Sequence, residues 1–291
     1  MKSLLSVSAT GSTGSTTLTC VLARYLHVAC HRRVLVLDLA EPARCAQVLG
    51  TYAHGAFGQG FGHGRGTAAL AGASSQACTD GVHVLKADAL EGLVSRNDPA
   101  RTRYYANLRR LLSVMASWFD VCLIDAPALP DLRAVCALAP VDAVLSPVVV
   151  SAQCVNRAAG VINGTYGIRN VRARLNPALH FLGLLPVMRT PTSLEGAWAR
   201  AMEATLQAWL IPGPAFPRGY VYLPHLDAAG LLREPLVPGR KLARHTVAGG
   251  GPRVMLACLD ALAQRLEAVR DSGVSAAPAA PAVCDAEVCN V

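Results

Sequence analysis

Lysine is scarce in this chain. Only three lysines, Lys2, Lys86 and Lys241, occur among the 291 residues, although the formal net charge is +8. Lysine and arginine together number 27, so the other 24 basic residues are arginines. This positive charge favours an acidic partner such as nucleic acid or a phosphate-bearing surface, but an arginine-rich proteome would produce it equally well.

Long apolar runs are absent as well. No segment approaches the ~18 continuous apolar residues of a helix that spans a bilayer. The apolar start at residues 1–5 faintly resembles a signal peptide, but a polar loop interrupts it before any cleavage-like site. Apolar residues still make up 52% of the chain, which is ample for one principal domain. We expect a cytoplasmic protein with no membrane contact.

Cysteine motifs are the third absence. The ten cysteines are scattered singly, with no CxxC pair and no Cys/His ligand spacing. Most lie within apolar segments, where a cysteine packs as a small hydrophobe. We therefore predict buried free thiols in a reducing compartment.

A glycine-containing polar loop lies near the start of the chain. It comprises Gly11, Ser12, Thr13, Gly14, Ser15, Thr16 and Thr17. An apolar stretch at residues 4–7 precedes it and a helix-like run at 18–29 follows it, which is the setting in which main-chain N–H groups cradle phosphate. In such loops a lysine follows the last glycine, and the next hydroxyl reaches Mg²⁺. Here Ser15 takes the lysine position, whereas Thr16 keeps the hydroxyl.

Two apolar runs end in aspartate. Asp38 closes the run at residues 33–38, and Asp125 closes the apolar part of residues 119–127. Carboxyl ends of parallel strands line the ligand crevice, so both acids should lie beside the loop. We predict that the loop residues, Asp38 and Asp125 bind nucleotide. Thr16 would hold Mg²⁺ directly, and Asp38 and Asp125 would act through water.

Strand-like and helix-like patterns alternate along the chain. Further strand-like runs lie at residues 81–86, 143–150 and 179–186, and helix-like runs at 101–117, 152–168, 193–210, 227–233 and 252–270. This alternation predicts an α/β fold with a doubly wound, mostly parallel sheet flanked by helices.

One domain is expected over residues 1–270. It contains a Gly/His-rich loop insertion at 50–66, whose histidines could bind metal or simply decorate an exposed loop. An Ala/Pro-rich tail at 271–291 lacks any core pattern, so we expect it to be disordered.

These motifs, taken in order, resemble the ParA/MinD family of deviant Walker-type P-loop ATPases. The similarity covers about residues 3–270 and includes residues 122–127, similar to the family's Walker B segment, and 176–186, similar to the stretch that leads into its base-binding region. A doubly wound P-loop NTPase fold follows from this resemblance.

The chain departs from the family at its catalytic positions. The family loop reads Lys-Gly-Gly-x-Gly-Lys-Thr-Thr, so both lysines are replaced here, by Thr10 and Ser15. Ala40 replaces the second acid of the family's strand-two ending. The resemblance therefore implies a degenerate Walker A loop that binds ATP and Mg²⁺ weakly or not at all, with little or no ATP hydrolysis.

The resemblance also implies a role in plasmid or chromosome partition, or in positioning other cargo. Its expected partners are nonspecific DNA, a ParB-like or other adaptor protein, and a second copy in a homodimer. The candidate DNA-binding residues are Arg233, Arg240, Lys241, Arg244 and Arg253, for which a solvated charged face is the alternative.

Two other functions stay open. The first is an accessory subunit of a secretion or cellulose-synthesis system, similar to ParA-like proteins that also lack the phosphate lysine. The second is an active ATPase whose cation comes from Arg44, Arg65 or a partner.

Overall fold

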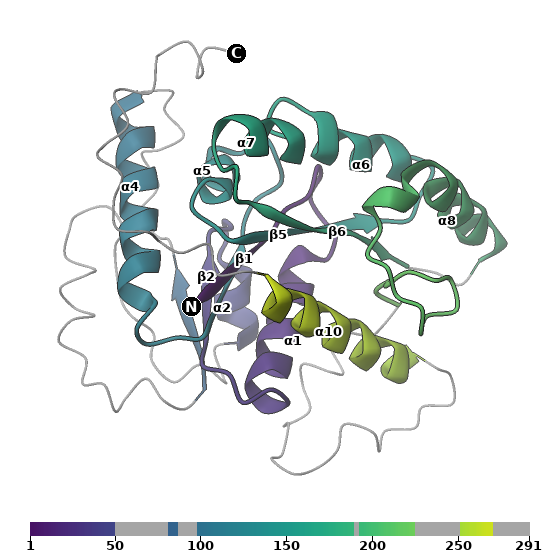
Figure 1. The fold of residues 1–291 in the computed structure, drawn as a ribbon, viewed down its shortest axis with the longest axis horizontal. Coiled ribbons are helices and arrows are strands. Elements are labelled where there is room, and N and C mark those ends of the chain that lie inside the picture. Colours follow the sequence, from purple (N-terminus) through teal and green to yellow (C-terminus); the bar gives the residue numbers. More distant parts are fainter. Residues whose placement is uncertain (50–80, 87–97, 189–191, 225–250, 270–291) are drawn as a thin grey trace.

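Six parallel strands form the centre of the protein (Figure 1). The computed structural model describes residues 1–49, 81–86, 98–188, 192–224 and 251–269. The strands are β1 (Lys2–Ser6), β2 (Val34–Asp38), β3 (Val82–Lys86), β4 (Val121–Asp125), β5 (Ala143–Val149) and β6 (His180–Val187). Their order is β3-β2-β4-β1-β5-β6, and every pairing is parallel. This confirms the predicted fold class.

Helices cover both faces of the sheet. They are α1 (Ser15–Val28), α2 (Arg44–Leu49), α4 (Asp98–Met115), α5 (Leu132–Leu138), α6 (Cys154–Asn163), α7 (Ile168–Arg174), α8 (Ser193–Leu206) and α10 (Gly251–Ala268). Residues of α1, α2 and α10 share one core cluster with one face of the strands, and residues of α4, α5 and α7 share a second cluster with the other face. Two apolar layers therefore enclose the sheet, as in doubly wound folds.

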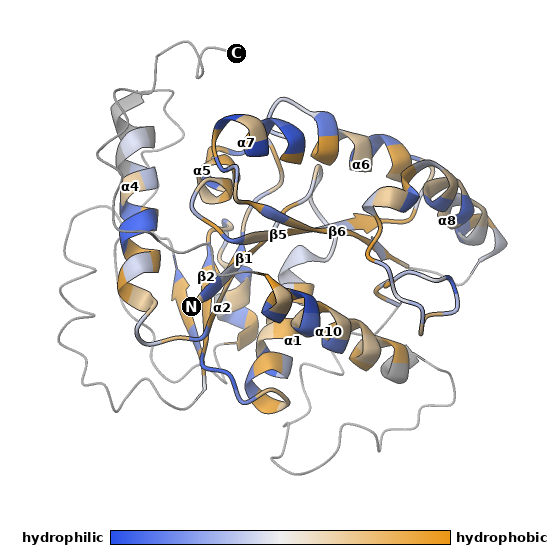
Figure 2. Ribbon diagram, viewed as in Figure 1, coloured by the Kyte–Doolittle hydropathy of each residue, from blue (hydrophilic) through white to orange (hydrophobic). Residues whose placement is uncertain are grey.

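The strand sequences explain this burial on both faces. Side chains alternate along a strand, so Leu4 and Val36 pack on the α1 side, whereas Leu5 and Leu37 pack on the α4 side. All five residues of β2 are buried. Figure 2 shows the apolar sheet between helices that combine apolar and polar stripes. Continuous apolar runs are typical of parallel strands covered on both sides.

Helix α10 packs on this core. Cys258, Leu259, Leu262 and Leu266 are buried in the cluster that α1 and β1 also line. Among the described residues, no helix combines the length and apolar character needed to cross a membrane.

Two helix predictions were wrong in extent. The run at 152–168 forms one helix, α6, which ends at Asn163. Helix α7 begins at Ile168, the last residue of the run, and Gly164 and Gly167 lie between the two helices. A Cβ at Gly167 would lie 2.7 Å from the main-chain nitrogen of Gly164, so this turn requires glycine. The run at 193–210 ends as helix at Leu206, and a short 3₁₀ turn, η2 (Gln207–Trp209), follows.

Several predicted segments lie outside the described residues. These are the Gly/His-rich loop at 50–66, the short helix at 227–233 and the tail at 271–291. The division into one domain and a tail therefore stays a prediction.

Candidate nucleotide site

The sheet register brings the predicted acids beside the loop. Asp38 pairs in register with Asp125, and Asp125 pairs with Ser6 at the end of β1. The glycine-containing loop follows β1 directly, so the two acids and the loop share the carboxyl edge of three neighbouring strands. Asp38 and Asp125 are 0% and 1% exposed.

The loop bends back on itself before α1 begins. Ser12 has a φ of 59° and Gly14 a φ of 87°, both in the left-handed region. Gly14 suits this conformation, because glycine has no Cβ to clash. Gly14 is the N-cap of α1, and its cap makes no side-chain hydrogen bond. The first N–H groups of an α-helix lack intrahelical acceptors, so this turn offers donors and a positive dipole end to an anion.

Hydroxyl groups line the start of α1. Thr16 Oγ1 donates a 2.7 Å hydrogen bond to Asp125 Oδ2, and the hydroxyls of Thr13 and Ser15 lie 3.1 Å apart. The residue with the Mg²⁺-compatible hydroxyl is therefore held against an acid at the end of β4. Ser15 adds a second hydroxyl where a lysine would add a charge.

Burial dominates the electrostatics of Asp125. Desolvation raises the pKa of this carboxyl, and the hydrogen bonds from Thr16 and Cys45 and the charge of Arg44 oppose that rise. Asp125 Oδ1 is buried and makes no hydrogen bond. A cation near this oxygen would compensate the cost of burying it unpaired.

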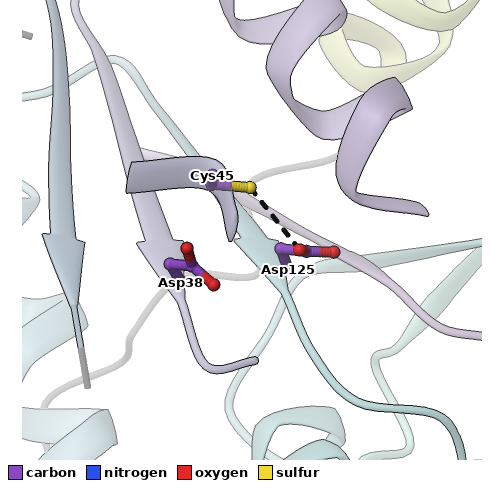
Figure 3. A group of neighbouring side chains, drawn as sticks. All are labelled: Asp38, Cys45 and Asp125. Carbon is purple, nitrogen blue, oxygen red and sulfur yellow. Dashed lines mark hydrogen bonds between the residues drawn. The ribbon is translucent and has the colours of Figure 1, made fainter. Parts of the chain in front are cut away.

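Cys45 is a site residue that the sequence did not reveal. Its Sγ lies 3.5 Å from Asp125 Oδ2, and α2 holds it over the ends of β2 and β4 (Figure 3). A hydrogen bond with Cys20, burial and the nearby carboxylates all raise the pKa of the Cys45 thiol. The prediction of a buried free cysteine is correct, but its position beside both acids required α2, which the sequence analysis did not predict.

Solved structures with this architecture include proteins that contain bound nucleotide. A variant of Cyanothece McdA in complex with ATP superposes with a TM-score of 0.63 at 14% identity, covering 93% of this chain and 97% of that one. Cobyrinic acid a,c-diamide synthase from Mycobacterium smegmatis, with a bound ATP analogue and magnesium, gives 0.59 at 18% identity and covers 93% and 98%. MinD from Pyrococcus furiosus gives 0.54 at 20% identity and covers 91% and 100%. The chain has the ParA/MinD-type P-loop fold.

This likeness is one of structure. No family model matches the sequence, and no curated protein matches it. The ParA/MinD-type fold is therefore shown by the arrangement of the elements.

The residues present fit a nucleotide and Mg²⁺ in part. The amides at the start of α1, the Thr16 hydroxyl and the two buried aspartates suit phosphate and a hydrated Mg²⁺. The cationic side chain of a P-loop is missing at Ser15. Lys2 begins β1, at the end away from the loop, where it contacts Glu267.

Two other cations lie nearer the acids. Lys86 is exposed at the end of β3, in register with Asp38. Arg44 is exposed at the start of α2, and its charge lowers the pKa of Asp125. Arg65, the other arginine that the sequence suggested as a replacement cation, lies outside the described residues.

The predicted DNA-binding cluster is not described by the structure. Arg233, Arg240, Lys241 and Arg244 lie in an undescribed segment, and Arg253 lies in α10 with an undescribed side chain. Another basic region was not predicted. Residues 143–194 contain five arginines and no acidic residue: Arg157, Arg169, Arg172, Arg174 and Arg189.

Three of these arginines form an exposed basic face on α7, namely Arg169, Arg172 and Arg174. Arg169 lies over the ring of Trp209, 5.1 Å from its centroid. Within the described part of the chain, these three side chains make no ion pair. Helix α7 precedes β6, which begins at His180. The α7 arginines therefore lie toward the edge of the sheet where the strands begin, whereas the loop lies at the edge where the strands end.

Proposed function

We propose that this protein is a positioning protein of the ParA/MinD type that binds nucleotide weakly and hydrolyses little or none of it. The observation that carries the proposal is the start of α1. The Gly14 cap makes no side-chain hydrogen bond to the first main-chain amides, and Thr16 is hydrogen-bonded to Asp125, but Ser15 supplies no charge. The similar McdA and MinD structures support a positioning role. Its cargo would be a plasmid, a chromosome or another cellular body.

The chemistry of phosphoryl transfer explains the expected loss of turnover. Catalysis of this reaction depends on positioning and on cations that stabilise charge on the transferred phosphoryl group. Ser15 and Thr10 stand where the resemblance expects lysines, and Ala40 stands where it expects an acid. Mg²⁺ would supply charge at the phosphates when bound, while Thr16, Asp38 and Asp125 would position it.

A weakened nucleotide site shifts the function toward binding partners. The α7 face carries three exposed arginines at the edge opposite the loop, so it could contact DNA phosphates without competing for nucleotide. A homodimer driven by nucleotide should be weak, because Thr10 cannot provide a cation to a partner's nucleotide. An adaptor protein of the ParB kind is the other expected partner.

Duplex DNA binding at several salt concentrations tests this role. We expect binding at low salt that weakens steeply as the salt concentration rises. Contacts between arginine and phosphate release counterions from DNA, and this release favours binding less when the salt concentration is high. Replacing Arg169, Arg172 and Arg174 with glutamine should reduce the salt dependence, whereas Arg200→Gln, on α8, should change it little. Absence of any binding at low salt would remove the DNA role and favour an accessory protein that acts through a protein partner.

A further inference from the structure

Three buried side chains gather at the carboxyl edge of the sheet. Asp38, Cys45 and Asp125 come from the end of β2, from α2 and from the end of β4, and each is at most 1% exposed. One ligand atom from each residue lies within 4.8 Å of the other two. Figure 3 shows the sulfur above two neighbouring carboxylates.

We propose that Asp38, Cys45 and Asp125 form a binding site for a thiophilic divalent cation of the Zn²⁺ class. This site shares Asp38 and Asp125 with the predicted position of hydrated Mg²⁺ but adds the Cys45 sulfur, and its occupation does not depend on nucleotide binding. Its distinguishing feature is the sulfur, because Mg²⁺ takes oxygen ligands and a thiolate selects softer ions such as Zn²⁺.

One distance in the cluster already matches such an ion. With Zn–S and Zn–O bonds of about 2.3 and 2.0 Å, tetrahedral coordination places sulfur and oxygen about 3.5 Å apart. Cys45 Sγ and Asp125 Oδ2 lie 3.5 Å apart. This pair could therefore bind the ion with little movement of either side chain.

A second observation comes from Asp125 itself. Its Oδ1 is buried without a hydrogen-bond partner, so the carboxyl is only partly satisfied by Thr16 and Cys45. The charge of Arg44 lowers the pKa of Asp125, but the Arg44 side chain is exposed. A divalent ion among the three side chains would neutralise charge that the protein buries there.

Binding of the ion exchanges the thiol proton of Cys45 for a metal–sulfur bond. The ion forms bonds to Cys45 Sγ and to one oxygen of each aspartate, and the thiol proton leaves to solvent. Thr16 Oγ1 keeps its hydrogen bond to Asp125 Oδ2 and orients that carboxylate from outside the coordination shell. Three protein ligands leave a fourth tetrahedral position for water.

The test uses the full chain after metal has been removed with a chelator. Titration with Co²⁺, which replaces Zn²⁺ in such sites, should give one equivalent of sulfur-to-cobalt charge-transfer absorption in the near ultraviolet, and added Zn²⁺ should abolish it. Millimolar Mg²⁺ should leave it unchanged. No such absorption in the wild-type chain would overturn the proposal.

Variants identify the ligands. Cys45→Ser should remove the absorption and weaken Zn²⁺ binding at least about 100-fold. Cys258 in α10 is buried as fully as Cys45. Its variant Cys258→Ser should keep both the absorption and the Zn²⁺ affinity. Asp38→Asn keeps the side-chain shape and should also weaken Zn²⁺ binding, which provides a second reading if Cys45→Ser does not fold. An absorption that persists in Cys45→Ser would assign the metal to other cysteines, and an unchanged Zn²⁺ affinity in Asp38→Asn would contradict the site.

Discussion

The Ser15→Lys variant is expected to bind ATP about 10- to 100-fold more tightly than the wild-type chain. Ser15 is the first residue of α1 and follows Gly14, where P-loops carry the lysine that reaches the terminal phosphates. Hydrogen bonds to charged groups contribute about 1.5 to 3 kcal/mol, which corresponds to that range of affinity. Titration of both proteins with a fluorescent ATP analogue in the presence of Mg²⁺ would measure the gain.

The matched control for this variant is Ser15→Met. Methionine has nearly the length of lysine but no charge, so it should give no gain in affinity. Hydrolysis by Ser15→Lys should stay slow, because Thr10 and Ala40 are unchanged. Equal affinities for Ser15→Lys and Ser15→Met would mean that this position does not face the phosphates.

The Gly183→Ala variant is expected to lose about 3 kcal/mol of unfolding free energy, because strain and overpacking each cost roughly 1 to 3 kcal/mol. Gly183 has a φ of 135°, which side chains rarely adopt, and it sits at a register shift where Val144 pairs with Phe181 and Leu145 with Gly183. An added Cβ would lie 2.7 Å from Ile211 Cγ1 and 3.0 Å from the Trp209 carbonyl oxygen.

Gly219→Ala separates the two contributions. Gly219 also has a positive φ, of 74°, but an added Cβ would meet no atom within 4 Å. This variant should therefore cost only about 1 to 2 kcal/mol, the strain of a left-handed residue with a side chain. Urea unfolding midpoints of the two variants and the wild-type chain give the comparison. Equal losses would show that contacts at Ile211 and Trp209 carry no cost.

The sheet was predictable from the sequence because its strands leave strong local signals. Parallel strands covered on both faces read as continuous apolar runs, and two of these runs end in Asp38 and Asp125. The left-handed turn at Gly14 and the helix after it follow a recognisable pattern as well. Because the strands are parallel, the acids had to meet at one edge of the sheet.

The parts that were not predictable depend on short or non-local features. Helices α2 and α5 have only six and seven residues, too few to show a clear 3.6-residue period. Without α2, nothing in the sequence places Cys45 beside Asp125, because a single cysteine in an apolar segment reads as core packing. The proximity of Lys86 to Asp38 likewise depends on the pairing of β3 with β2.

The most direct test of the account is a titration of the wild-type chain with fluorescent ATP, with and without Mg²⁺, followed by measurement of the ADP formed. The account predicts weak binding through main-chain amides, an affinity well below that of Ser15→Lys, and no ADP above the rate of uncatalysed hydrolysis. Tight binding together with steady accumulation of ADP would contradict it. In that case a cation such as Arg44 or Lys86, or one from a partner chain, must reach the phosphates.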